Sequence, residues 1–99
     1  MYAMTGKLIA QTGKRAELIA ILKRAADVVA QLRGCRLYIV HEDAVNENCV
    51  WIYEMWDDKE SHDASLKDER VRALISEAMP LMGGAPEGSV LRVAGGHGI

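Results

Sequence analysis

The stretch CVWIYEMW, residues 49–56, decides the fold. It is rich in β-branched and aromatic residues, which favour a strand. The stretch CRLYIVH, residues 35–41, has the same character, and the polar residues 42–48 between the two contain two asparagines. The pair therefore predicts a β-hairpin. Few polar residues interrupt residues 49–56, so we expect both faces of this strand to be covered.

A strand and a helix are predicted before the hairpin. Residues 3–11 contain Leu8 and Ile9 and end at a Thr-Gly break, which indicates a first strand. Over residues 14–32 the apolar residues recur with the period of an amphipathic helix. Gly34 is placed to end that helix.

Helical segments and one more strand follow the hairpin. Asp57 and Asp58 favour a helix start, because aspartate caps the first turn and complements the helix dipole. The helical pattern covers residues 59–66 and 68–79, and Pro80 stops it. Residues 89–94 then form a short last strand.

The element order is strand, helix, strand, strand, helix, strand. This order predicts an α+β chain with a ferredoxin-like βαββαβ fold, in which the helices cover one face of an antiparallel sheet. The other face also carries apolar groups. Two such faces packed together would remove both from water, so we expect a homodimer formed through the sheet faces.

Size and composition limit the other possibilities. A chain of 99 residues forms one domain, with a core over residues 1–94 and a flexible tail over 95–99. The net charge of −2 comes from scattered charges, so we expect no nucleic-acid partner. No apolar run is long enough to span a membrane and no signal peptide begins the chain, so we expect a cytoplasmic protein.

Two cysteines, Cys35 and Cys49, are present. A reducing compartment and the small number of cysteines favour two free thiols over a disulfide. No close pair of Cys or His residues has the spacing of a zinc site, so we expect no metal site.

Four segments together resemble the antibiotic biosynthesis monooxygenase family, in its quinol monooxygenase branch. These are residues 6–14, residues 34–38, the Tyr-Glu-Met-Trp end of residues 53–56, and the His-Asp-Ala-Ser-Leu run of residues 62–66. The most specific part is the Glu-x-Trp strand end followed by a helix with residues 62–66. The likeness covers nearly the whole chain.

The resemblance implies a dimeric α+β barrel that oxidises a quinol or a polycyclic or polyphenolic aromatic substrate with molecular oxygen, without metal or flavin cofactor. It also implies a pocket between the helices and the sheet, with Trp56 in its wall. Two positions depart from the family. Ser65 stands where quinol oxidases of the family often have histidine, and Ile52 stands where some polyketide-oxidising relatives have asparagine. Heme-degrading relatives need an Asn-Trp-His set that this chain lacks.

Cofactor-free oxygenation needs a base that removes a phenolic proton from the substrate. His62 is the candidate catalytic residue, because histidine titrates near neutral pH and the predicted helix follows Trp56 directly. The alternative is that His62 only caps or packs the first turn. Glu54 lies two residues before Trp56, so the two side chains share a sheet face. A carboxylate in an apolar strand is either a site residue or half of a structural ion pair.

Trp56 can stack on an aromatic substrate, although a strand tryptophan also fits a plain core. Tyr38 and His41, also candidates for substrate binding, have opposite parity on one strand, so they cannot both face the pocket. His41 can be a solvated strand end, and Tyr38 can pack at the dimer seam. Met79, Leu81 and Met82 can line a pliable pocket wall or fill core gaps.

Three functions remain open at this point. The first is a cofactor-independent monooxygenase with His62 as base. The second is a non-catalytic dimeric ferredoxin-like module that binds an aromatic ligand. The third is an isomerase or lyase in which Glu54 and His62 shuttle a proton.

Overall fold

The computed structural model describes all residues 1–99 and has the predicted ferredoxin-like α+β architecture. Its elements, in chain order, are β1 (Tyr2–Ile9), α1 (Arg15–Val29), β2 (Cys35–Glu42), β3 (Cys49–Trp56), α2 (Lys59–Ser65), α3 (Glu69–Ala78), the 3-10 turn η1 (Met79–Leu81) and β4 (Glu87–Arg92).

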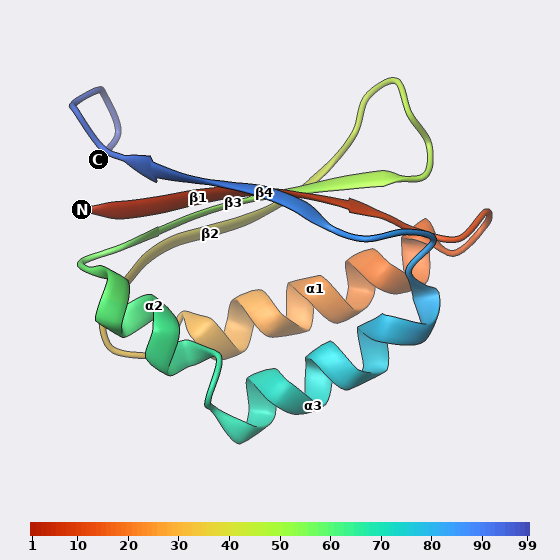
Figure 1. Cartoon of the computed structure of the whole chain (residues 1–99), viewed down its shortest axis with the longest axis horizontal. Helices are drawn as coiled ribbons and strands as arrows, with labels where there is room; N and C mark the ends of the chain where they lie inside the picture. Colours follow the sequence, from red (N-terminus) through yellow and green to blue (C-terminus); the bar gives the residue numbers. More distant parts are fainter.

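The four strands form one antiparallel sheet in the order β2-β3-β1-β4 (Figure 1). The predicted hairpin is confirmed, because Tyr38 pairs with Glu54 and His41 pairs with Trp51. The register shifts between Cys35 and Leu37, where a bulge interrupts β2. All three helices lie below the sheet in Figure 1, so the sheet has one helix-covered face and one open face.

Side-chain parity assigns the residues of β3 to these two faces. Val50 and Trp56 pack into the helix-side core, and successive side chains of a strand point to opposite faces. Ile52 and Glu54 therefore also face the helices, whereas Trp51 and Tyr53 lie on the open face.

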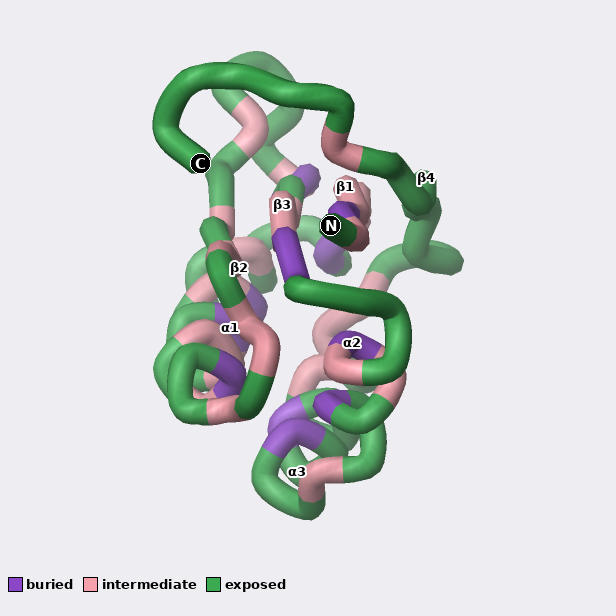
Figure 2. Tube along the Cα trace, turned by 90° about the vertical axis from the view of Figure 1, so that its left-hand side faces the viewer, coloured by how far each residue is buried: buried purple, intermediate pink, exposed green.

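Two apolar clusters make the core. The first joins Leu18 and Leu22 of α1 to Val50 of β3 and to Ala10. The second, toward the other end of the sheet, joins Val29, Trp56 and Val71. Figure 2 shows buried positions where α1 and α3 face each other and the sheet. The core thus lies between one sheet face and the helix pair.

Two aspartates begin the helices after the hairpin. Asp58 accepts a hydrogen bond from the backbone N–H of Ser61, at 2.8 Å, and caps α2. Asp68 accepts from the N–H groups of Arg70 and Val71 and caps α3. Asp57, which we also expected at the helix start, instead pairs with Arg36 on β2 at 2.5 Å. Each cap supplies an acceptor for N–H groups that have no partner within the helix.

The element boundaries differ from the predicted ones by up to three residues. Helix α1 ends at Val29 rather than at residue 32, because a turn precedes Gly34, whose φ of 84° is readily adopted only by glycine. Strand β4 begins at Glu87 rather than at residue 89, because Glu87 already pairs with Lys7 of β1. The apolar pattern of the sequence alone does not show where a turn begins or which residues of two strands pair.

Both cysteines are free thiols. Cys35 begins β2 beside Trp56, whereas Cys49 begins β3 at the other end of the same hairpin. A disulfide needs Cα atoms within about 7 Å of each other, which two opposite ends of a hairpin cannot supply. No helix of the structure combines the length and apolar character needed to cross a membrane.

Candidate active site

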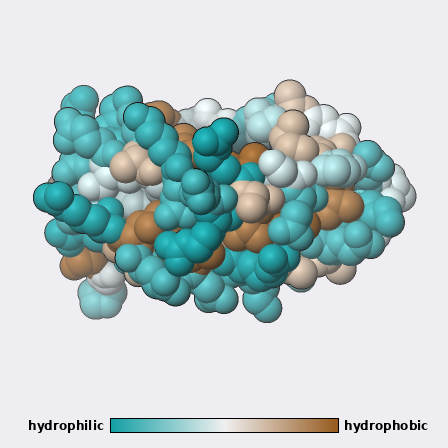
Figure 3. Space-filling model, turned by 90° about the horizontal axis from the view of Figure 1, so that it is seen from below, coloured by the Kyte–Doolittle hydropathy of each residue, from teal (hydrophilic) through white to brown (hydrophobic).

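A cavity of about 390 Å³ lies between the sheet and the helices. Of its 20 lining residues 15 are hydrophobic, which favours a ligand with a mostly apolar body. Figure 3 views the helix-covered side and shows apolar patches between the charged and polar groups. The apolar lining comes from both long helices, from the sheet, from the end of α2 and from the segment before β4: Leu8, Ile21, Leu22, Ala25, Val29, Ile52, Leu66, Val71, Leu74, Ile75, Ala78, Met79, Met82, Ala85 and Pro86.

Glu54 supplies a carboxylate to this apolar cavity. Its Oε1 accepts a hydrogen bond from the indole N–H of Trp56 at 2.8 Å. No lysine or arginine pairs with it, and the nearest group that can carry positive charge is His62, whose Nε2 lies 3.6 Å from Oε1. Of the two alternatives left open for Glu54, a structural ion pair with lysine or arginine is absent, whereas a pair with His62 and a role in the site are both compatible with this placement.

His62 projects inward from α2 and is buried, with 7% of its surface exposed. Its Nδ1 lies 3.0 Å from Oδ1 of the neighbouring Asp63, and its Nε2 faces Glu54. The helix start is capped by Asp58 instead. The imidazole therefore does not cap the helix. It lies at the polar end of the cavity, next to the carboxylate, and also packs against the rings of Tyr2 and Trp56.

Trp56 is fully buried and is not part of the cavity lining. Val29 and Val71 pack against it, so its ring offers no free face for a stacked substrate. Its indole edge touches the site in a different way, through the N–H that holds Glu54. The ring that we expected in the pocket wall is thus a core residue that orients the carboxylate.

Tyr38 lines the cavity and lies directly opposite Glu54 in the β2–β3 register. Its hydroxyl makes no hydrogen bond within the chain, so it is free to donate to a ligand. Burial raises the pKa of Tyr38 far above its usual value, and the nearby Glu54 charge raises that pKa further. Tyr38 therefore remains a neutral phenol at physiological pH.

His41 lies on the open face of the sheet, opposite Trp51, and is exposed. It is not part of the cavity. Parity on β2 allowed only one of Tyr38 and His41 to face the helices, and the structure selects Tyr38. The structure thus brings together Tyr38, Glu54 and His62 and leaves out His41.

The structure also adds residues to this constellation. Asp63 bonds to His62, and the Tyr2 ring lies 5.2 Å from the imidazole, centroid to centroid. Asp63 directly follows the candidate base, which was a usable signal, but sequence reasoning gave it no role. Tyr2 had no signal, because its position depends on how β1 pairs with the end of β3. Met79 and Met82 line the cavity as expected for a pliable wall, whereas Leu81 packs against the core.

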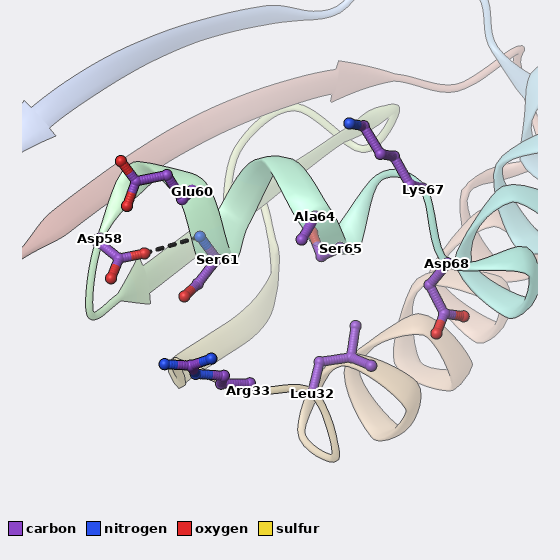
Figure 4. Close-up of a pocket in the computed structure, with 9 residues that line it drawn as sticks. All are labelled: Leu32, Arg33, Asp58, Glu60, Ser61, Ala64, Ser65, Lys67 and Asp68. Carbon is purple, nitrogen blue, oxygen red and sulfur yellow. Dashed lines mark hydrogen bonds between the residues drawn. The ribbon is translucent and has the colours of Figure 1, made fainter.

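A second hollow of about 550 Å³ lies on the surface between the end of α1 and α2 (Figure 4). Its lining is mostly polar, with Arg33, Glu60 and Lys67 at the surface. The carboxylates of Asp58 and Asp68 in this hollow already cap the two following helices. The apolar cavity with Glu54 and His62 is therefore the better candidate for chemistry. No group of three His, Cys, Asp or Glu side chains is placed to hold a metal ion.

The raised pKa of Tyr38 gives a testable pH dependence. Above the ordinary tyrosine pKa of 10.0 the unfolded chain loses the Tyr38 proton while the folded chain keeps it, so folding stability falls as pH rises past that value. We expect Tyr38→Phe to lose less stability than the wild type between neutral and strongly alkaline pH, measured by urea unfolding. An identical alkaline loss in the two proteins would show that Tyr38 ionises normally in the fold.

Comparison with known proteins gives the family. The family model described as "Antibiotic biosynthesis monooxygenase" matches residues 1–77. A solved structure from Chloroflexus aurantiacus J-10-fl, named as a "putative Antibiotic biosynthesis monooxygenase", is 39% identical, with a TM-score of 0.89 over 99% of this chain and 97% of that one. No curated protein matches the sequence.

More distant structures share the fold. One from Caulobacter crescentus CB15, carrying the same family name, is 21% identical with a TM-score of 0.89, covering 95% of this chain and 90% of that chain. Another, from Bacteroides thetaiotaomicron VPI-5482 and described as a "Possible Oxidoreductase", is 16% identical with a TM-score of 0.83, covering 91% and 94%. The chain belongs to the antibiotic biosynthesis monooxygenase family.

Proposed function

We propose that the protein is a cofactor-independent monooxygenase that oxidises a quinol or another polyphenolic aromatic compound with molecular oxygen. The observation that carries this proposal is the pairing of Glu54 and His62 at one end of an otherwise apolar cavity. A buried acid–base pair that faces an apolar space suits removal of a proton from a bound hydroxyl.

The cavity favours one orientation of such a substrate. Its hydrogen-bonding side chains, Tyr38, Glu54, His62 and Ser65, come from β2, β3 and α2, whereas α1 and α3 supply aliphatic groups. A flat aromatic body fits between the helices, with one hydroxyl directed at Glu54 and His62. Aliphatic side chains line most of the cavity, which favours a substrate whose far side is apolar.

The proposed reaction requires from the protein a base and a hydrogen-bond donor. His62 accepts the hydroxyl proton, and the electron pair of the O–H bond stays on the substrate as an electron-rich anion that reduces oxygen. Tyr38 can donate to the oxygen that carries the developing charge, because it stays protonated. One atom of the oxygen molecule enters the ring and the other leaves as water, so the substrate itself supplies the electrons.

Oxygen uptake tests the proposed function. With a panel of naphthohydroquinones we expect protein-dependent uptake and a product heavier by one oxygen atom with two hydrogens lost. His62→Ala should lower the turnover rate by about 100-fold or more, since general-base catalysis contributes at least that much. His97→Ala, in the exposed C-terminal segment, is the matched control and should retain the wild-type rate.

Two outcomes would count against this function. Uptake equal to the no-protein control across the panel would remove it, and so would turnover that is unaffected in His62→Ala. The non-catalytic alternative is favoured if the ligand binds without turnover. Trp56 reports binding, because its N–H holds the carboxylate that faces the cavity, so quenching in a Trp51→Phe background would reveal a bound ligand.

We also propose that the working form is a homodimer assembled through the open sheet face. No helix covers this face (Figure 1), yet it carries Ile39, Trp51 and Leu91, which are 40%, 39% and 45% exposed. Lys7 lies over the Trp51 ring at 5.6 Å from its centroid. A second copy would cover these apolar groups with the same surface, which is how two-fold interfaces are built.

The mass in solution tests the dimer. Light scattering at micromolar concentration should give twice the chain mass of 10.9 kDa. Ile39→Glu places a charge in the proposed interface and should give the single-chain mass, because the buried charge would have no partner. Val45→Glu, at a position 95% exposed in the β2–β3 loop, should leave the dimer intact. A single-chain mass for the wild type would contradict the proposal.

A further inference from the structure

The imidazole of His62 is held on three sides. Asp63 Oδ1 lies 3.0 Å from Nδ1, and the other oxygen of Asp63 bonds to Lys59 Nζ at 2.6 Å, four residues earlier on α2. The Tyr2 ring lies 5.2 Å away at an angle of 45°, and the Trp56 ring meets the imidazole edge-on at 6.0 Å and 81°. These contacts fix the plane of the ring.

The hydrogen bond to Asp63 decides which ring nitrogen carries the proton. Lys59 and His62 both stabilise the Asp63 carboxylate, and the pKa of Asp63 lies below its ordinary value. Asp63 is therefore ionised at neutral pH and can only accept a hydrogen bond. Nδ1 must be the donor, so in the neutral imidazole the lone pair is on Nε2, the nitrogen that faces Glu54 and the cavity.

We propose that Asp63 is the positioning residue of the site and that it holds His62 as the Nδ1–H tautomer with the Nε2 lone pair directed into the cavity. Asp63 does not line the cavity and acts through His62. The proposal deepens the proposed function and rests on it for its kinetic part. The assignment of the tautomer itself does not depend on any activity.

In this tautomer the substrate proton moves to Nε2 of His62. The substrate O–H bond breaks, its electron pair stays on the substrate oxygen, and the proton bonds to Nε2. The resulting imidazolium then lies between the carboxylates of Asp63 and Glu54, both within 4 Å of a ring nitrogen. Opposite charges at this distance stabilise the cation that the transfer creates.

Without Asp63 the opposite tautomer is expected. Glu54 Oε1 lies 3.6 Å from Nε2, and an ionised carboxylate can accept a hydrogen bond but cannot donate one. With nothing left to hold a proton on Nδ1, the Nε2–H tautomer can donate to Glu54. The Nε2 lone pair would then be lost to the substrate, although the side chain remains in place.

Nitrogen NMR of ¹⁵N-histidine-labelled protein tests the assignment directly. At a pH where the imidazole is neutral, the wild type should show His62 with a protonated Nδ1 and a bare Nε2. Asp63→Ala should shift His62 to the Nε2–H form. Glu60→Gln, on the same helix and with the same loss of one negative charge, should leave the wild-type tautomer unchanged. A wild-type His62 already in the Nε2–H form would overturn the proposal.

Kinetics on the same variants tests the role. We expect Asp63→Ala to lower kcat by at least about tenfold while KM stays nearly constant, because the cavity lining that binds the aromatic body is unchanged and His62 stays in place but in the wrong tautomer to accept the proton. Asp63→Glu, which restores a carboxylate, should recover part of the rate. A change in KM alone, or full activity in Asp63→Ala, would show that Asp63 has only a structural role.

The two kinds of failure remain distinguishable. If the wild type oxidises no quinol but NMR shows the Nδ1–H tautomer that switches in Asp63→Ala, the proposed function fails and the tautomer assignment stands. If turnover depends on His62 but the tautomer is Nε2–H or does not respond to Asp63→Ala, the function stands and the positioning role fails.

Discussion

The hydrogen bond from the Trp56 indole to the Glu54 carboxylate, at 2.8 Å, is the interaction on which the site depends. Burying a carboxylate between the sheet and two helices costs free energy unless the carboxylate has hydrogen-bond partners. The indole N–H supplies one such partner without adding charge. Because Trp56 is fully buried between Val29 and Val71, the donor cannot move away. The carboxylate therefore keeps one oxygen bound and is held at the polar end of the cavity.

The other residues that surround Glu54 come from separate parts of the chain. The β2–β3 register places Tyr38 beside Glu54, and a short turn after β3 allows α2 to return His62 toward the same carboxylate. Asp58 begins α2 by accepting from Ser61, which fixes where the helix starts and so which side of it faces inward. The two long helices then enclose the aliphatic part of the cavity.

Local chemistry made much of this predictable. Strand-forming residues and helical periodicity predicted the order of the elements, and parity predicted that Glu54 and Trp56 share a face. However, side-chain parity does not show how deeply a side chain is buried. It could not show that α1 and α3 cover the Trp56 ring, and so it could not distinguish a stacking wall from a core residue that orients Glu54.

Local sequence patterns cannot predict that His62 lies next to Glu54. It depends on the direction of α2, which the turn after Trp56 sets, and on the pairing of β1 that places Tyr2 against the imidazole. Asp63 directly follows His62 in the sequence, but this adjacency alone does not show which ring nitrogen faces the aspartate. An aspartate next to a histidine acquires a function only when the ring is turned so that one nitrogen faces it and the other faces a cavity.

A crystal structure with a bound naphthol tests the central claim most directly, because it shows both whether the cavity holds an aromatic ring and which side chains contact the hydroxyl. The account predicts the aromatic body between α1 and α3 and the hydroxyl within hydrogen-bonding distance of His62 Nε2 or Glu54. A naphthol bound elsewhere, or an inner space closed by the side chains of Leu22, Leu74 and Met82, would contradict it.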